Sequence, residues 1–216
     1  MLDYNKFIGT IDNSFLSHNE IEDVKTKIFN HHHLWQTSPY RPNARFFPYG
    51  LYSEPLLRYA KSVSNYKDIL DLLFSSYYEK IQQRLSNIFQ RNCCYHNFYC
   101  KPGFHIFGPK ELDYTHLNFH YDLFSNRVFG KLYSFIIPIM VPESGAGLLY
   151  CEPEDKNIAS AMKNPLTLKY TKPGMLAMWD ATILHAIKPF TLKENEYRIT
   201  WQFHVAIRDP NPIIFW

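Results

Sequence analysis

The sequence HLNFHYDL spans residues 116–123 and alternates polar with apolar side chains. Successive side chains of a β-strand point to opposite faces, so the polar members of this stretch would share one face. Residues 197–206 show the same alternation. The polar faces comprise His116, Asn118, His120 and Asp122 in the first stretch, and Arg198, Thr200, Gln202 and His204 in the second. The alternation fits a strand that faces water or one that lines a wet cavity, but metal-ligand and anion-binding residue types favour the cavity.

Short segments punctuated by Pro and Gly surround these two stretches, and their number and close spacing predict a sandwich or jelly roll. We expect an α+β fold in which a jelly-roll, cupin-like core is packed by N-terminal helices. The candidate strands are residues 94–100, 103–107, 115–121, 131–140, 147–151, 166–170, 174–179, 183–187 and 197–206. Residues 152–164 are polar enough for a loop or a short helical insert.

The first 92 residues have helical periodicity instead. Residues 17–20, SHNE, have the form of a capping box before a helix, and residues 66–89 carry the strongest apolar stripe at helical spacing. A further helix is expected to begin near Ser53, and the proline-rich segment 38–49 is a connection that could form a lid. We therefore predict one domain, 1–216, with helical support in 1–92 and the catalytic core in 93–216.

Composition excludes several classes of protein. A 46% hydrophobic content with 17% aromatics argues against disorder. The net charge of +3 is too weak and dispersed for a nucleic-acid partner. The longest apolar stretch, 132–141, is about half a membrane span and contains Pro138. The first residues do not form a secretory signal, and the four cysteines fit reduced thiols, so we expect a soluble cytoplasmic protein without membrane contact.

His120 and Asp122 are two residues apart, so both side chains could reach one ion from one strand edge, and His185 could join them. Two imidazoles and one carboxylate are the ligand set that holds a non-haem ferrous iron and leaves other positions open. Arg198, with Thr200 on the same face, could hold the carboxylate of an oxo-acid cosubstrate. Taken singly, His185 could equally be an ordinary core histidine and Arg198 a surface ion-pair residue; their order, spacing and strand context together favour a site.

With these motifs the chain resembles the Fe(II)- and 2-oxoglutarate-dependent dioxygenases, which share a double-stranded β-helix core. The resemblance covers roughly residues 97–207. It rests on His120-Tyr121-Asp122, on residues 145–150 (GAGLLY), on residues 172–179 (KPGMLAMW), on His185 and on Arg198-Ile199-Thr200.

The resemblance implies that His120, Asp122 and His185 bind Fe(II) and form the catalytic centre. Arg198 would form a salt bridge with the distal carboxylate of 2-oxoglutarate, since a guanidinium matches a carboxylate bidentately, and Thr200 could donate to it. Asn118 and Tyr133 are further candidates for cosubstrate contact. The implied reaction uses O2 and 2-oxoglutarate, releases succinate and CO2, and hydroxylates a C–H bond. The carboxylate of Asp122 favours hydroxylation over halogenation, while desaturation and cyclisation remain alternatives.

The substrate is less clearly indicated. Arg127, Trp179 and Tyr121 are candidates for substrate contact, and a small polar molecule such as an amino acid or a natural-product intermediate suits a chain of this size. One alternative is a hydroxylase that acts on a protein side chain, and another is a non-catalytic, cupin-like binding protein. A zinc hydrolase would leave Arg198 and Thr200 without a purpose, and the charge pattern gives a nucleic-acid demethylase little support. The oligomeric state is left open.

Overall fold

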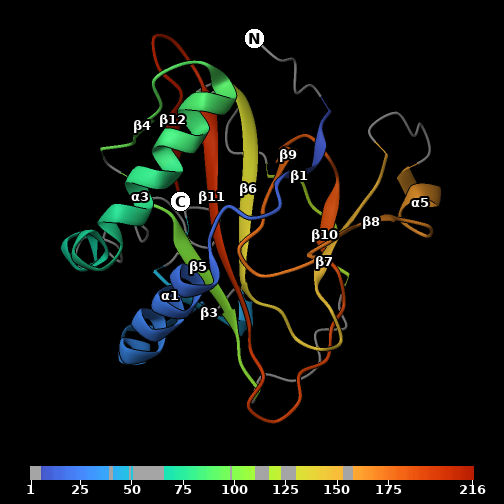
Figure 1. Ribbon diagram of the computed structural model, residues 1–216. Helices are drawn as coiled ribbons and strands as arrows, with labels where there is room; N and C mark the ends of the chain where they lie inside the picture. Colours follow the sequence, from blue (N-terminus) through green and yellow to red (C-terminus); the bar gives the residue numbers. More distant parts are fainter. Residues whose placement is uncertain are drawn as a thin grey trace.

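The fold consists of one large and one small β-sheet, antiparallel except for the pair β12 (Ile213–Phe215) and β4 (Cys94–Tyr95), with helices on the outer face of the large sheet (Figure 1). The computed structural model describes residues 6–38, 41–48, 50, 66–97, 99–109, 117–122, 130–152 and 158–216. The helix expected near Ser53 lies outside these residues, as do His116 and Arg127.

The large sheet has nine strands, with the order β1-β9-β6-β11-β5-β3-β2, and β12 pairs with both β11 and β4. The small sheet has the order β10-β7-β8. The strands of the large sheet are β1 (Ile8–Asp12), β2 (Gln36–Ser38), β3 (Arg41–Phe47), β4 (Cys94–Tyr95), β5 (Gly103–Phe107), β6 (Lys131–Met140), β9 (Leu176–Asp180), β11 (Arg198–Ile207) and β12 (Ile213–Phe215). Those of the small sheet are β7 (Gly147–Tyr150), β8 (Leu166–Lys169) and β10 (His185–Ile187).

This arrangement confirms the α+β jelly roll expected from the sequence. Strands β5, β11, β6 and β9 lie side by side in the large sheet, while β10, β7 and β8 face them in the small sheet. An isolated antiparallel bridge between His120 and His185 adds the segment 117–122 to the edge of the small sheet. From β5 to β11 the chain passes back and forth between the two sheets, with only β7 and β8 consecutive in the small sheet. This is the connectivity of a double-stranded β-helix.

Two long helices, α1 (His18–Asn30) and α3 (Lys67–Phe89), cover the outer face of the large sheet. Helix α1 begins with the expected capping box, in which Ser17 and Glu20 bond each other's backbone N–H groups. A 3-10 turn, η1 (His32–Leu34), follows α1, and the short helix α5 (Ile158–Ala161) lies in the polar segment before β8. None of the helices among the described residues is long and apolar enough to cross a membrane.

The proline-rich segment differs from the sequence prediction. Residues 41–47 were expected to form a connection or lid, but they form β3, which pairs with β5 through Arg45, Phe46 and Phe47. Pro42 lies at the start of the strand, before the residues that pair with β5, so its missing N–H costs no bond of that ladder. Residues 1–92 therefore contribute strands as well as helices.

The hydrophobic core is divided by the large sheet. The larger cluster joins α1 and α3 to the outer face of the sheet, through residues such as Phe74, Phe104 and Trp201. The smaller cluster lies between the two sheets and includes Ile136, Leu148 and Trp179. Adjacent residues of β6 and β11 face opposite clusters. Every second side chain of these strands therefore points into the space between the two sheets.

Candidate metal centre

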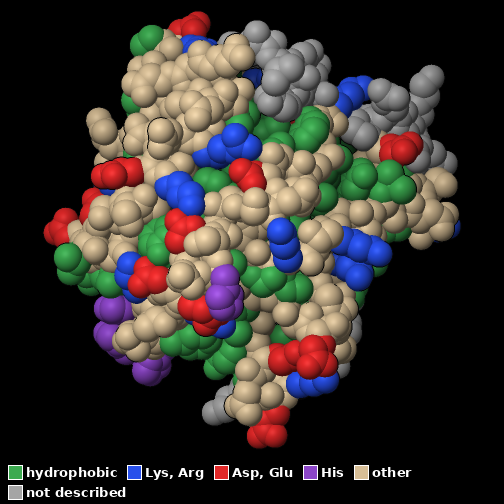
Figure 2. Space-filling model, in the orientation of Figure 1, with side chains coloured by type: hydrophobic (Ala, Val, Ile, Leu, Met, Phe, Trp, Pro, Cys, Tyr) green, Lys and Arg blue, Asp and Glu red, His purple; other side chains and the backbone are tan. Residues whose placement is uncertain are grey.

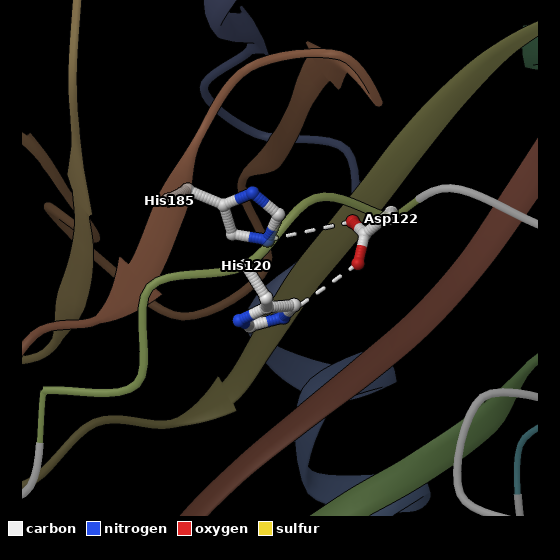
Figure 3. A group of neighbouring side chains, drawn as sticks. All are labelled: His120, Asp122 and His185. Carbon is white, nitrogen blue, oxygen red and sulfur yellow. Dashed lines mark ion pairs between the residues drawn. The ribbon is translucent and has the colours of Figure 1, made fainter. Parts of the chain in front are cut away.

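His120, Asp122 and His185 converge at the edge of the small sheet (Figure 3). One ligand atom from each of them lies within 4.8 Å of the others. Asp122 Oδ1 is 3.7 Å from His120 Nε2, and Asp122 Oδ2 is 3.4 Å from His185 Nε2. The convergence expected from the sequence is therefore present in the structure.

The backbone explains why the two histidines meet. His120 and His185 are directly opposite in the isolated bridge, in which each backbone N–H donates to the carbonyl of the other residue at 2.8 and 3.0 Å. Asp122 N–H then donates to Ala181 O at 3.2 Å, which holds the segment against the turn before β10. Residues separated by sixty-five positions in the chain are thus fixed by main-chain bonds.

Both imidazoles are oriented by a second hydrogen bond. His120 Nδ1 lies 2.8 Å from Asn118 O, and His185 Nδ1 lies 2.9 Å from Ile183 O. A carbonyl oxygen only accepts, so each Nδ1 carries a hydrogen, and in the neutral imidazole Nε2 carries the lone pair. Metal-binding histidines are commonly oriented in this way. The donor set of two Nε2 atoms and one carboxylate therefore fits a divalent iron.

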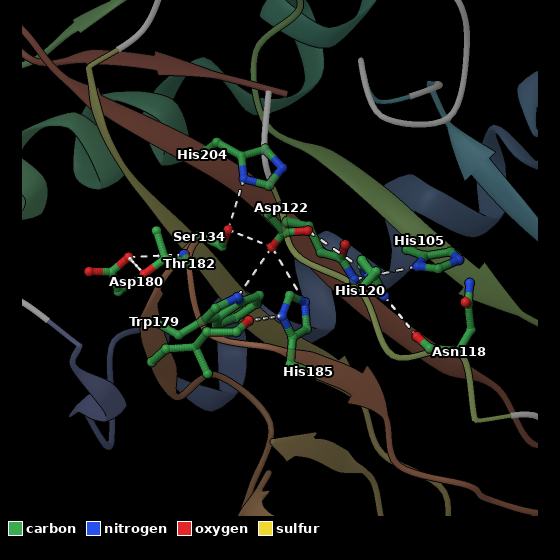
Figure 4. A network of polar contacts seen from close by, with 12 residues as sticks. His105, Asn118, His120, Asp122, Ser134, Trp179, Asp180, Thr182, His185 and His204 are labelled. Carbon is green, nitrogen blue, oxygen red and sulfur yellow. Dashed lines mark hydrogen bonds and ion pairs between the residues drawn. The ribbon is translucent and has the colours of Figure 1, made fainter. Parts of the chain in front are cut away.

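Asp122 stays ionised despite its surroundings. Burial by itself raises the pKa of this carboxyl, but His185, His204 and His120 together with a hydrogen bond from Ser134 hold the pKa well below its ordinary value. Ser134 Oγ donates to Asp122 Oδ2 at 2.6 Å, and Trp179 Nε1 donates to the same oxygen at 3.2 Å (Figure 4). The site therefore contains a fixed negative charge next to two imidazoles.

A cavity of about 40 Å³ adjoins the three residues and extends between the sheets. Its wall combines polar groups from β5 and β11 with apolar groups from both sheets. The lining residues are His105, His120, Asp122, Ser134, Phe135, Ile136, Leu148, Trp179, His185, Ile187, Gln202 and His204.

Arg198 and Thr200 share the inward face of β11 with Gln202 and His204, the two residues of this strand that line the cavity. Arg198 and Thr200 are both fully buried. The guanidinium carbon of Arg198 lies 5.4–5.7 Å from the centres of three aromatic rings. Thr200 Oγ1 accepts a hydrogen bond from Gln202 Nε2 at 2.8 Å. Aromatic surroundings lower the local dielectric and strengthen a charge-assisted pair with an anion. The rings are those of Phe107, Tyr170 and Phe190.

Two of the residues expected to contact the cosubstrate do not line the cavity. Tyr133 faces the helices, where its ring packs 5.6 Å from that of Phe89, because its neighbour Ser134 faces the site. The side chain of Asn118 is exposed and does not line the cavity; its part in the site is the carbonyl that accepts from His120. A tyrosine does approach Arg198, but it is Tyr170: burial raises its pKa to about 12, against the charge of Arg198.

Of the described residues expected to contact substrate, Trp179 lines the cavity and Tyr121 does not. Trp179 is buried at the site, but its indole N–H is directed to Asp122. Tyr121 is 40% exposed and is not part of the cavity wall. Ser134 and His204 were not predicted as site residues. The position of His204 on the same strand face as Arg198 was a usable signal, whereas Ser134 stands in an apolar run that gives none.

No protein-family model and no curated protein matches the chain. Solved structures match it along most of its length. HygX from Streptomyces hygroscopicus, solved with nickel, 2-oxoglutarate and hygromycin B, is 10% identical with a TM-score of 0.56, and the match covers 96% of this chain and 86% of that one.

Two further solved structures also match the chain along most of its length. An N-substituted L-amino acid dioxygenase from Burkholderia ambifaria AMMD, solved with α-ketoglutarate, is 14% identical over 93% of this chain and 83% of that one, with a TM-score of 0.54. The non-haem α-ketoglutarate-dependent epimerase SnoN is 10% identical over 95% and 82%, also at 0.54. Identities this low show similarity of fold. The chain therefore has the double-stranded β-helix fold of the Fe(II)- and 2-oxoglutarate-dependent oxygenases.

Proposed function

We propose that the protein is an Fe(II)- and 2-oxoglutarate-dependent oxygenase that hydroxylates a C–H bond of a small polar molecule. The observation that carries this proposal is the convergence of His120, Asp122 and His185, with both Nδ1 atoms bonded to carbonyls, inside this fold. Iron and 2-oxoglutarate, when bound, would supply the oxidation: substrate, O2 and 2-oxoglutarate give hydroxylated substrate, succinate and CO2.

The chain's own residues would bind, orient and shield. His120, Asp122 and His185 would hold the iron, with Ser134 and Trp179 fixing the carboxylate of Asp122. Arg198 would pair with the distal carboxylate of 2-oxoglutarate, and Thr200 and Tyr170 would contribute hydroxyl groups near it. The apolar residues of the cavity wall would keep water from the reacting groups.

The proposed substrates are small polar molecules. HygX was solved with hygromycin B, and the Burkholderia protein is described as acting on N-substituted L-amino acids. Acidic and basic side chains are interspersed on the face shown in Figure 2, which suits a small-molecule substrate better than nucleic acid. We propose amino acids and natural-product intermediates as the first classes to test, and a cytoplasmic location as expected from the sequence.

The direct test is succinate release by the purified, iron-loaded protein against a panel of amino acids, N-substituted amino acids and aminoglycosides. Substrate-stimulated succinate with a product heavier by one oxygen atom would support hydroxylation; an isomer or a dehydrogenated product would instead place the enzyme with the epimerases or desaturases. Stimulation by peptides alone would favour the protein hydroxylase. If neither succinate nor the anaerobic Fe(II)–2-oxoglutarate absorption band appears, the non-catalytic binding protein is the better assignment.

Arg198 gives a sharper version of this test. Arg198→Ala should weaken 2-oxoglutarate binding at least ~10-fold, because a buried charge-assisted pair is lost, while Ni²⁺ affinity stays close to that of the wild type. His120→Ala should show the opposite pattern, in which the affinity for Ni²⁺ is the one that falls most. Calorimetric titrations with Ni²⁺ and then 2-oxoglutarate measure both affinities. An unchanged affinity for 2-oxoglutarate in Arg198→Ala would remove this residue from the cosubstrate site.

A further inference from the structure

The two carboxylate oxygens of Asp122 have different surroundings. Oδ2 lies 3.4 Å from His185 Nε2 and accepts two hydrogen bonds, from Ser134 Oγ at 2.6 Å and from Trp179 Nε1 at 3.2 Å (Figures 3 and 4). Oδ1 lies 3.7 Å from His120 Nε2. A carboxylate oxygen offers about two lone-pair sites. The donors from Ser134 and Trp179 therefore occupy the two lone-pair sites of Oδ2, so Oδ1 is the oxygen that can bind a cation.

The donor at Ser134 is itself held by His204. A serine hydroxyl has one hydrogen, and that of Ser134 is given to Asp122. The contact of 3.1 Å between Ser134 Oγ and His204 Nδ1 must then be a bond in which His204 donates. The direction of the chain is thus fixed: His204 Nδ1–H donates to Ser134 Oγ, and Ser134 O–H donates to Asp122 Oδ2.

The sheet register brings these groups together. Ser134 on β6 is directly opposite His204 on β11 and directly opposite Trp179 on β9. The three side chains therefore form one row across three adjacent strands, on the face that looks toward the small sheet. Ser134 and His204 are buried, at 0% and 4% exposure, so water does not compete strongly for these bonds.

We propose that His204 and Ser134 are a positioning pair that holds Asp122 so that it binds iron through Oδ1 alone. This inference rests on the proposed function and assigns to it two residues beyond the metal ligands. A carboxylate held in this way would take up one position at the iron, beside those of His120 and His185, and so leave room for the cosubstrate. His204 touches neither metal nor substrate in this arrangement; its effect passes through Ser134.

The first test is the affinity for Ni²⁺, measured by calorimetry on the full chain. Ser134→Ala should bind Ni²⁺ about 10-fold more weakly than the wild type, since loss of such outer partners typically costs 10–100-fold. The matched control is Ser86→Ala, which removes a half-buried serine hydroxyl of α3, far from the site in the fold, that bonds Gln82 O and Cys93 N. This control should leave the Ni²⁺ affinity unchanged.

Two replacements of His204 separate positioning from simple filling of space. The side-chain amide of Asn can place an N–H where Nδ1 was, whereas the longer Gln places it near the former Nε2. We expect His204→Asn to retain the Ni²⁺ affinity within a few-fold and His204→Gln to lose about as much as Ser134→Ala. A merely structural role would make both replacements lower the unfolding temperature without separating their metal affinities.

A double-mutant cycle then tests the order of the chain. If His204 acts only through Ser134, then Ser134→Ala combined with His204→Gln should bind Ni²⁺ as Ser134→Ala does alone. Additive losses, or an unchanged affinity in Ser134→Ala, would overturn the positioning pair. Should Ser134→Ala not fold, as judged by circular dichroism, the comparison of Asn with Gln at position 204 still decides.

The outcomes are distinct from those that test the proposed function. Unaltered Ni²⁺ affinity in Ser134→Ala, together with intact succinate release, would refute only the positioning pair. Ni²⁺ binding that depends on His120, without any 2-oxoglutarate turnover by the wild type, would refute the oxygenase but leave the pair open to the same measurements.

Discussion

His204 lies on β11, opposite Ser134 of β6, and its burial has a consequence for stability. Burial lowers the pKa of this imidazole from 6.5 to about 4, although the charge of Asp122 opposes the shift. The native protein therefore keeps His204 neutral over a range in which the unfolded chain would protonate it. By linkage, the state that binds more protons gains as the pH falls.

We accordingly expect the free energy of unfolding of the metal-free protein to fall between pH 6.5 and 4, by up to about 1.4 kcal/mol per pH unit from this group. Below pH 4 the contribution becomes constant, because both states are then protonated. Urea titrations of the wild type and His204→Asn across this range give the free energy of unfolding at each pH. The difference between the two slopes against pH measures the contribution of His204. His33→Asn, at an exposed histidine, is the control; equal slopes for His204→Asn and wild type would contradict the prediction.

Individual residues show which parts of the site could be predicted from the sequence and which could not. The alternation around His120 and Asp122 identified the ligands, because a strand with one polar face can be read directly. Strand β6 is buried on both faces, so its apolar sequence does not say which side is inward. The sequence therefore could not show that Ser134, and not its neighbour Tyr133, faces the site, because this depends on the register with β9 and β11.

Among the elements, the two long helices agree well with the sequence: the stripe over residues 66–89 corresponds to α3, and the start of α1 lies at the expected capping box. The capping box of α1 is local in the chain, so the residues SHNE predicted the start of the helix directly. Strand β3 was not foreseen because its partners, β2 and β5, are only known once the sheet is formed. Strand β12 has three residues, too few to show an alternation, and it was missed as well.

Glu20, the second member of the capping box, also links the two long helices. Glu20 bonds the backbone N–H of Ser17 and pairs with Lys80 of α3 at 2.7 Å. Ser17→Ala should lower the free energy of unfolding by about 1 kcal/mol, since an unfilled N-cap typically costs 0.5–2 kcal/mol. Urea denaturation measures the loss, and Ser14→Ala, in the preceding turn, is the control. A loss equal to that of the control would mean that the cap is not needed here.

At the scale of the whole molecule, the large sheet separates the tasks of stability and chemistry. Its outer face packs on α1 and α3 and holds most of the buried aromatic rings, while its inner face carries Ser134, His204 and Arg198. A rigid, apolar outer layer keeps the strands in register, and the register fixes the distances in the site. Mutations on the outer side should therefore change stability while leaving the metal affinity of the folded protein intact.

Trp216 is the most direct test of this separation. It is fully buried, its indole N–H donates to Pro48 O at 2.8 Å, and its backbone N–H donates to Cys100 O at 3.0 Å. The indole also fills the space beside Gly103, where an added Cβ would lie 2.1 Å from Nε1. The side chain thus packs on β5 and bonds the segment around Pro48, and the backbone of the same residue bonds Cys100, outside the metal centre.

Trp216→Ala should lower the free energy of unfolding by about 3–5 kcal/mol, because a large aromatic side chain is lost and a cavity remains. Trp216→Phe keeps most of the ring and loses the bond to Pro48, so its loss should be nearer 1–3 kcal/mol. Urea unfolding gives both values, and calorimetry under conditions where each variant is folded should give the wild-type affinity for Ni²⁺. A Ni²⁺ affinity that falls in parallel with stability across the two variants would show that the outer packing and the metal centre are coupled, and that the two faces of the sheet do not act independently.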